Sequence, residues 1–442
     1  MENQEIEYKE SWREEFLQTV CAFANTNGGR LYIGINDKGI EVGISNIKKL
    51  LDDIPSKIKN KLGIIPSLNS NVKNDKEIIE ITITASNVPI SYSGKYYIRS
   101  GSSTFELTNN ELSAFLLKKS GQTWDGVAYP NSSIKNIKTE TIEYFKSLAE
   151  NRLPEISKTT TLQTTLGNLR LLENDTVKNA GLLLFSETPQ QFFPTCTIRI
   201  GEFKTETELI TDDIIEGNLF EQVNKTLGLL KTKYLKSEYY YEGLLRKERF
   251  PYSEKALRES ILNAIVHRDY SISSHIFIKV YADKLIISNP GELPPQLTVE
   301  LLKNEHTSVP KNPLLARVFY FAGLIESWGR GTLTMLNESR QAKAPAPLFE
   351  NQRGIFSVTF FTFQGLFDNN SLSDRQQNLI NFFISNDELS SGQLMSLFIQ
   401  KTKEKISQKT ITRDLQELVE KNIIYRKGQT KDSKYSLWDF ID

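Results

Sequence analysis

The sequence predicts an α+β protein of several domains. Its 442 residues exceed the roughly 100–200 residues of a typical single domain. Helical and strand-like hydrophobic spacing alternate along the chain, and the polar segment DNNSLSD at 368–374 has the composition of a linker. We therefore expect domains at 1–120, 251–365 and 375–442, a connecting α/β region at 121–250, and a linker at 366–374.

The composition excludes several classes of protein. Positive and negative side chains balance at 54 each, so any basic surface that attracts a polyanion must be local. Two cysteines exclude a disulfide scaffold and a zinc site built from four thiolates, and three histidines leave little for a His-based metal centre. The N-terminal segment is polar and no apolar run is long enough to span a bilayer, so we expect a cytoplasmic protein without membrane association.

The first predicted domain combines one helix with several strands. Phe16, Val20 and Phe23 fall on one face of a helix that ends at an Asn-Gly-Gly sequence. Strands are expected at 31–35, 77–84 and 95–104. In the connecting region, the apolar run AGLLLF at 180–185 and TIRIGEF at 197–203 are predicted as strands, and no chemical motif is evident there.

The segment ESILNAIVHRDY at 259–270 carries the clearest chemical pattern. Its spacing places Glu259 and Asn263 on one helix face. An Asn carbonyl can bind Mg²⁺ while a Glu polarises an attacking water. His267 and Arg268 follow one turn later, where they could meet phosphate charge. The alternative is an ordinary polar helix face, with the later WGRG at 328–331 a simple turn.

Three segments in order, ESILNAIVHRDY, YADKLIISNPGELP and KNPLLARVFYFAGLIESWGRGT, resemble the GHKL ATPase fold, with an α/β sandwich core. More specifically, the sequence resembles the divergent GHKL branch that is found in bacterial helicase-related transcriptional regulators. It implies ATP with Mg²⁺ as the ligand and at most weak hydrolysis. The roles it implies are general base for Glu259, Mg²⁺ ligand through ATP for Asn263, adenine pocket for Asn289 and Gly291, and phosphate turn for Gly329 and Gly331.

This sequence departs from the parent fold in two places. The parent fold usually has an Asp at the position of Asn289, where it accepts a hydrogen bond from the adenine amino group. An Asn can accept through its carbonyl but lacks the charge. The glycine-rich lid is also reduced to a single Gly-x-Gly.

EIEYKESWREEFLQTVCAFANTNGGRLYIGINDKG at 5–39, with PISYSGKYYIRSGSSTFEL at 89–107, resembles the Schlafen-type AlbA-like domain. Most bacterial members are nucleic-acid-binding modules, and Arg99 is one cation that could serve such a role. Some animal relatives cleave structured RNA with three carboxylates and a divalent metal. Glu7 and Asp37 fall at two of those positions, so a nuclease using Mg²⁺ or Mn²⁺ is an alternative. Solvated surface acids are a third interpretation.

The C-terminal region predicts three helices and a hairpin, the order of a winged helix. Residues 401–434 hold ten Lys or Arg and five acids, a local net charge of +5. In a DNA-bound winged helix, the N-terminal residues of the recognition helix face the bases, and the residues of the wing face the phosphates. We expect the base contacts at Lys409, Thr412 and Arg413, and the phosphate contacts at Arg426, Lys427, Lys431 and Lys434. Protein docking is the competing role.

These patterns favour a transcriptional regulator that binds DNA at both ends and senses ATP in its core, as a homo-oligomer. The first alternative is a metal-dependent endoribonuclease that cleaves tRNA or other structured RNA, as in phage defence. The second is a nucleotide-gated scaffold. The HRDY sequence does not indicate a kinase, because the other kinase motifs are missing. Helicase activity is not expected without a P-loop.

Overall fold

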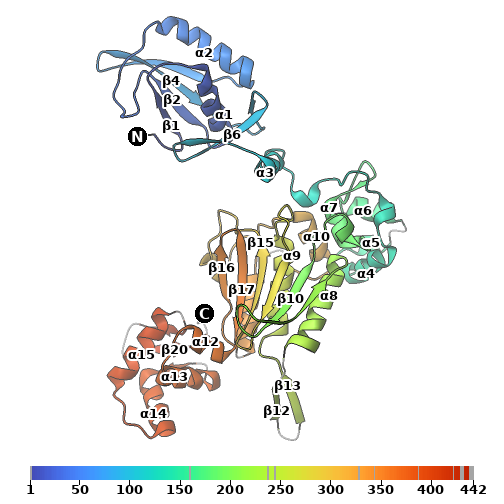
Figure 1. Ribbon diagram of the computed structural model, residues 1–442. Coiled ribbons are helices and arrows are strands. Elements are labelled where there is room, and N and C mark those ends of the chain that lie inside the picture. The colour runs from blue at the N-terminus through green and yellow to red at the C-terminus, as the bar shows by residue number, and fades with distance from the viewer. Residues whose placement is uncertain are drawn as a thin grey trace. The chain divides into compact units, whose positions relative to one another are not determined.

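The computed structural model describes residues 2–158, 161–235, 238–242, 245–326, 329–342, 344–386, 388–421, 423–428 and 433–437. The chain divides into two compact units, Met1–Thr123 and Trp124–Asp442 (Figure 1). Each unit is described separately below. None of the helices among these residues has the length and apolar character needed to cross a membrane.

The first unit is built on a four-stranded sheet of order β1-β2-β4-β3. Only β1 and β2 pair in parallel. The elements, in chain order, are β1 (Ile6–Lys9), α1 (Leu17–Asn25), β2 (Gly29–Ile33), α2 (Ile47–Leu62), β3 (Ser67–Lys73), β4 (Lys76–Ile83), β5 (Ser91–Tyr92), β6 (Lys95–Ser100), β7 (Ser103–Glu106) and α3 (Asn109–Lys119).

The core of this unit explains the AFANTNGG sequence at 22–29. Val20 and Phe23 of α1 are fully buried together with the inward residues of β2 and β4. A Cβ on Gly29 would stand 2.4 Å from the Phe23 ring, so the helix and strand approach too closely for a side chain there. Asn25 is buried and its amide nitrogen donates to the Ile90 and Tyr97 carbonyls at 2.8 and 2.9 Å. These residues are therefore required by packing.

The second unit contains a six-stranded sheet of order β11-β10-β14-β15-β17-β16, in which only β10 and β14 are parallel. The strands are β10 (Ile198–Phe203), β11 (Leu209–Ile215), β14 (Ile276–Val280), β15 (Lys284–Pro290), β16 (Leu348–Gln352) and β17 (Ile355–Phe361). Helix α9 (Glu254–His267) packs on β15 and contacts both α8 (Leu219–Leu229) and α11 (Gly331–Gln341). Alternating inward residues of β14, β15 and β17 join α9 in one core.

The remaining elements of the second unit flank this sheet and helix layer. They are α4 (Thr139–Ala149), α5 (Pro154–Ser157), α6 (Leu162–Asn168), β8 (Leu172–Glu173), β9 (Thr176–Val177), α7 (Asn179–Phe185), β12 (Glu238–Glu242), β13 (Leu245–Arg249), α10 (Pro313–Phe321) and α12 (Phe363–Asn369).

Two expectations for the region 121–250 need correction. The run AGLLLF lies in helix α7 and is not a strand. Every residue of α7 is buried, so its sequence lacks the polar face that would reveal a helical period. In addition, β10 and β11 belong to the six-stranded sheet, so the predicted boundary at residue 250 divides one sheet.

The C-terminal part has its own apolar core, formed by three helices and a small sheet of order β18-β20-β19. The elements are α13 (Asp374–Ser385), β18 (Leu389–Ser390), α14 (Ser391–Thr402), α15 (Gln408–Glu420), β19 (Tyr425–Lys427) and β20 (Lys434–Ser436). The predicted linker at 366–374 is shorter than expected. Helix α12 continues to Asn369, and α13 begins at Asp374 behind a capping box of Ser373 and Gln376.

Candidate nucleotide-binding pocket

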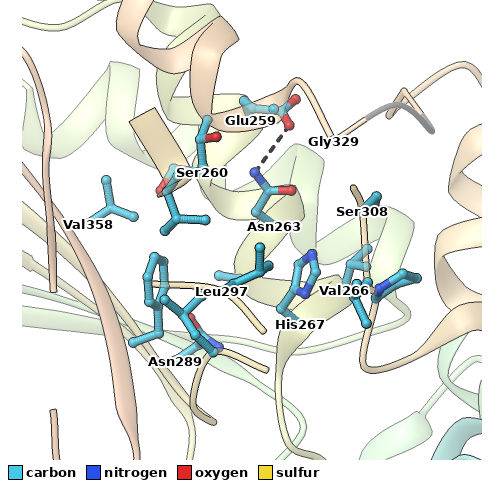
Figure 2. A pocket seen from close by; sticks show the side chains of 18 of the residues that line it. Glu259, Ser260, Asn263, Val266, His267, Asn289, Leu297, Ser308, Gly329 and Val358 are labelled. Atoms are coloured by element: carbon cyan, nitrogen blue, oxygen red, sulfur yellow. Dashed lines mark hydrogen bonds between the residues drawn. The ribbon is translucent and has the colours of Figure 1, made fainter. Parts of the chain in front are cut away.

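Helix α9 supplies one wall of the main pocket. It begins behind Ser253, whose side chain accepts a hydrogen bond from the Ala256 amide at 3.4 Å. The apolar face of α9 is buried in the core. Glu259, Asn263 and His267 recur every fourth residue on another face of the same helix, and their side chains line the pocket (Figure 2). The structure therefore places these three side chains on one face of α9, and this face borders a cavity.

The pocket encloses a cavity of about 110 Å³ between α9, the sheet and the start of α11. Asn289 and Gly291, near the end of β15, line it, as do Gly329 and Gly331. Apolar side chains from several elements complete the lining: Ile287, Leu293, Leu297, Met335, Phe356 and Val358. An apolar cavity with a few polar groups is the usual form of a small-molecule site.

Glu259 and Asn263 form a hydrogen-bonded pair. The Asn263 amide nitrogen donates to Glu259 Oε1 at 3.2 Å, which leaves the Asn263 carbonyl oxygen available to a cation (Figure 2). Burial raises the pKa of Glu259, against the hydrogen bond from Asn263, and the nearby Glu326 raises it further. A carboxylate in such a setting gains from a bound cation, which offsets its desolvation.

The Gly329–Gly331 turn lies directly against this pair. Gly329 has φ +68°, and a Cβ on it would stand 2.0 Å from the His306 carbonyl oxygen. A Cβ on Gly331 would stand 2.1 Å from Glu259 Oε1. At Gly329 the clash is with backbone and φ is positive, so glycine is required there, whereas a side chain at residue 331 would force the Glu259 carboxylate to move. The turn leads into α11, which begins at Gly331, so the N-terminus of this helix lies next to the Glu259 carboxylate.

Two buried hydroxyl groups in the pocket were missed by sequence reasoning. Ser260 Oγ and Thr332 Oγ1 line the pocket and have no hydrogen-bond partner in the part of the chain that the structure describes. Buried polar groups normally have partners, so these two indicate a site that a polar ligand or water completes. Their signal in the sequence was their position beside Glu259 and Gly331.

These features fit a nucleotide with Mg²⁺. The pocket offers a free amide carbonyl for the cation, unpartnered hydroxyls for polar oxygens, close-lying glycine backbone and an apolar lining for a base. Asn263 would hold Mg²⁺ through ATP and Asn289 would face the base. None of the described residues that line the pocket is a lysine or an arginine, so the cation would be the main counter-charge to the phosphates.

His267 is neutral in the folded protein. Burial lowers its pKa from the usual 6.5 to about 4, and the neighbouring His306 contributes to this. A neutral imidazole can donate or accept one hydrogen bond but adds no charge to meet a phosphate. The charged role expected for His267 is thus not supported at neutral pH.

The low pKa of His267 predicts a pH-dependent stability. Between pH 6.5 and about 4 the unfolded chain binds a proton at His267 and the folded chain does not. The free energy of unfolding should therefore fall as the pH is lowered through this window, by at most about 1.4 kcal/mol per pH unit. Urea unfolding at several pH values would measure it. His267→Gln should show a shallower decline than the unchanged protein, and equal slopes would contradict the prediction.

Arg268 does not belong to the pocket. Its side chain is buried, and the guanidinium donates to the carbonyl oxygens of Thr195 and Ser274 at 2.9 and 2.5 Å. It also stacks over the Tyr270 ring at 4.8 Å. The expected contact with phosphate is therefore wrong, because the backbone bends after His267 and directs the side chain into the core.

Asn312 is a further residue that the sequence did not single out. Its amide nitrogen donates to the Val266 and Arg268 carbonyls, both at 2.8 Å, and so closes the end of α9. Asn312 also precedes Pro313, the first residue of α10. It thus fixes the His267 end of the pocket wall.

In the first unit, Arg99 and Glu7 form a buried ion pair. The Arg99 side chain is 1% exposed and the Glu7 side chain 9%, and Lys9 contacts the other Glu7 oxygen at 2.7 Å. The Arg99 guanidinium also donates to the Asn3 and Ile6 carbonyls. The expected nucleic-acid contact at Arg99 is wrong, because its charge is already matched inside the fold.

The same pair bears on the nuclease alternative. Glu7 is occupied by Arg99 and Lys9, whereas Asp37 lies in an exposed turn. Across the described ranges, no three His, Cys, Asp or Glu side chains gather as metal ligands. The structure therefore does not bring Glu7 and Asp37 together as a site for Mg²⁺ or Mn²⁺.

The expected DNA-contacting residues at the C-terminal end are mostly exposed. Lys409, Thr412 and Arg413 lie on the outer face of α15, with Arg413 3.8 Å from Glu417. On the hairpin, Arg426 and Lys427 are exposed on β19. Two expected phosphate contacts differ from these: Lys434 pairs with Glu388 at 3.0 Å, and Lys431 lies outside the described residues.

Two family models match the chain. Residues 2–108 match "Schlafen, AlbA_2", and residues 273–360 match "Putative ATP-dependent DNA helicase recG C-terminal". The chain carries an AlbA_2 domain and a RecG-like ATPase domain. The second match starts after α9 and covers Asn289 and the Gly329–Gly331 turn. Together the matches indicate a nucleic-acid-binding, ATP-related protein.

Two solved structures are also similar to the chain. A Corynebacterium diphtheriae protein is 20% identical, and the alignment covers 94% of this chain and 87% of that one with a TM-score of 0.45. The N-terminal domain of a RecG-related protein from Nitrosomonas europaea is 27% identical, covering 24% of this chain and 86% of that one with a TM-score of 0.19. No curated protein matches the chain.

Proposed function

We propose that the chain is a nucleotide-responsive, DNA-binding transcriptional regulator with a GHKL-like core and a C-terminal winged helix. The observation that carries the proposal is the pocket in which Asn263 pairs with Glu259 beneath the Gly329–Gly331 turn. ATP with Mg²⁺ is the proposed ligand. By resemblance to the GHKL fold, we also propose that the protein acts as a cytoplasmic homo-oligomer.

The proposed mechanism is a shift between two conformations. Asn263 would hold Mg²⁺ from α9, and the cation would supply positive charge to the triphosphate. The Gly329–Gly331 turn contacts Glu259 directly, so a ligand between them changes the position of α11. A ligand shifts the population only if it binds the two arrangements with different affinity. DNA affinity should therefore depend on ATP.

The C-terminal DNA contact is supported by exposed cations. Lys409, Arg413, Arg426 and Lys427 lie on one helix and one strand of the small C-terminal domain. Cations on a recognition helix and its wing neutralise phosphates, and the released counterions make binding weaker at high salt. The nuclease alternative gains no support, because Glu7 is buried against Arg99.

The proposal is tested by DNA affinity with and without nucleotide. Fluorescence anisotropy of the full chain on a labelled duplex, at fixed salt, should give different dissociation constants with ATP and Mg²⁺ than without them. Calorimetry of ATP binding is run on the same preparation. ATP binding that leaves DNA affinity unchanged would contradict the regulatory coupling, and absent ATP binding would contradict the nucleotide site.

A separate prediction concerns the helix α15. Lys409→Ala with Arg413→Ala should weaken DNA binding by about tenfold or more at low salt, because two phosphate or base contacts are lost. The slope of affinity against salt concentration should also become shallower. Lys135→Ala, which removes an exposed lysine elsewhere, is the control. If the double variant binds DNA as the unchanged protein does, α15 is a protein-docking surface and not the DNA reader.

A further inference from the structure

Asn289 is a buried residue whose side-chain amide has no hydrogen-bond partner among the described residues. It lies on β15 beside Phe356 of β17, and the residue is 3% exposed. Its side chain makes no hydrogen bond with any residue that the structure describes, although it lines the pocket. Figure 2 places Asn289 at the end of the pocket away from Glu259. Its amide is therefore available to the part of a ligand farthest from the cation site.

The surroundings of Asn289 fit a flat heteroaromatic ring. Ile287, Leu297, Phe356 and Val358 line this side of the pocket. Apolar and aromatic side chains favour a planar base by removing its faces from water. Such contacts do not distinguish one purine from another, because both present the same kind of ring face. Selection between purines must come from hydrogen bonds at the ring edge.

The chemistry of the amide decides which edges it can bind. A carboxylate at this position could only accept hydrogen bonds, and it would be a buried charge without a cation beside it. The Asn289 amide can both accept and donate. Adenine offers a donor at its 6-amino group and an acceptor at N1, whereas guanine offers an acceptor at O6 and a donor at N1. Rotation of the amide by half a turn exchanges its two atoms and matches either edge.

We infer that Asn289 makes the pocket a site for purine nucleoside triphosphates in general, so that GTP binds with an affinity close to that of ATP. The inference rests on the proposed nucleotide site and adds the class of ligand. No hydrogen bond from a described residue fixes the orientation of the Asn289 amide, so these residues favour neither base. Loss of a single matched hydrogen bond can otherwise change the affinity substantially.

The test compares three nucleotides on the full chain. Calorimetry with ATP, GTP and CTP in the presence of Mg²⁺ should give dissociation constants for ATP and GTP within about tenfold of each other. CTP should bind about tenfold or more weakly, because its single ring fills less of the apolar lining. GTP binding about 100-fold weaker than ATP, or CTP binding as well as ATP, would overturn the inference while leaving the nucleotide site intact.

Two variants locate the effect at residue 289. Asn289→Asp should retain ATP and weaken GTP by about tenfold or more relative to ATP, because the carboxylate repels O6. Asn289→Ala should weaken ATP and GTP binding by a similar factor and so leave the ratio of the two affinities unchanged. This variant provides the test if the Asp variant does not fold. Asn69→Asp, the same change at an exposed position in the first unit, should leave the ratio unchanged. An unchanged ratio in Asn289→Asp would overturn the inference.

The failures of the two proposals are distinguishable. If no nucleotide binds to the folded chain, the proposed nucleotide site fails and the purine inference fails with it. If ATP binds and Asn263→Ala removes that binding, the site stands. The ratio of GTP to ATP affinity then tests, independently of the nucleotide site, whether Asn289 accepts both purines.

Discussion

Replacing Asn263 by Ala should remove measurable ATP binding. The side chain has one free carbonyl oxygen, and its amide nitrogen is fixed by Glu259 at 3.2 Å. The variant would lose a Mg²⁺ ligand and leave the buried Glu259 carboxylate without its hydrogen-bond donor. We expect ATP affinity to fall by at least about 100-fold, as measured by calorimetry with Mg²⁺.

The control for this change is Asn224→Ala. Asn224 is an exposed residue of α8, so the variant makes the same chemical change outside the pocket. It should bind ATP as the unchanged protein does. If Asn263→Ala remains folded by circular dichroism and still binds ATP with unchanged affinity, the pocket on α9 is not the nucleotide site.

The second large effect is expected at Arg99. Arg99→Met should lower the free energy of unfolding of the first unit by about 3–5 kcal/mol, because it leaves the Glu7 carboxylate buried without its main counter-charge. Urea unfolding of the full chain, followed by a probe of the first unit, measures this. Adding Glu7→Met to Arg99→Met should restore part of the lost stability, since no uncompensated charge then remains.

Lys95→Met provides the matched control. Lys95 pairs with Glu106 at 2.8 Å on the same hairpin, but the two side chains are 55% and 36% exposed. An exposed pair contributes about 0–1 kcal/mol, so the control should change stability little. Unchanged stability of Arg99→Met together with lost nucleic-acid binding would show that Arg99 is a binding residue after all.

Much of the nucleotide pocket was predictable from local sequence. Glu259 and Asn263 share a helix face because of their spacing alone, and glycine at 329 and 331 indicated a close backbone approach. In the first unit, the strands expected at 31–35, 77–84 and 95–104 correspond to β2, β4 and β6, because hydrophobic runs and alternation in the sequence match a sheet with a buried face.

Other features could not be predicted because they depend on long-range packing. Arg99, Arg268 and Arg413 were all expected to contact nucleic acid or phosphate, yet the first two are buried and the third is exposed. The sequence shows that a residue is charged but not which groups it contacts in the fold. For Arg99, the Ile6 carbonyl and the Glu7 carboxylate lie more than 90 residues away in the sequence. Helix α7 was mistaken for a strand because burial on all sides removes the polar face that marks a helix.

By itself, the amino-acid sequence determined many of the elements, the face of α9 that carries the polar residues, and the close backbone approach at Gly329 and Gly331. These are properties of spacing and backbone conformation, which act over a few residues. Only the tertiary structure decided which polar groups find partners among the described residues: Ser260 and Thr332 in the pocket have none, whereas Glu7 and Arg99 form an ion pair. The reason is physical, because burial makes a hydrogen bond or counter-charge necessary and distant segments of the chain supply it.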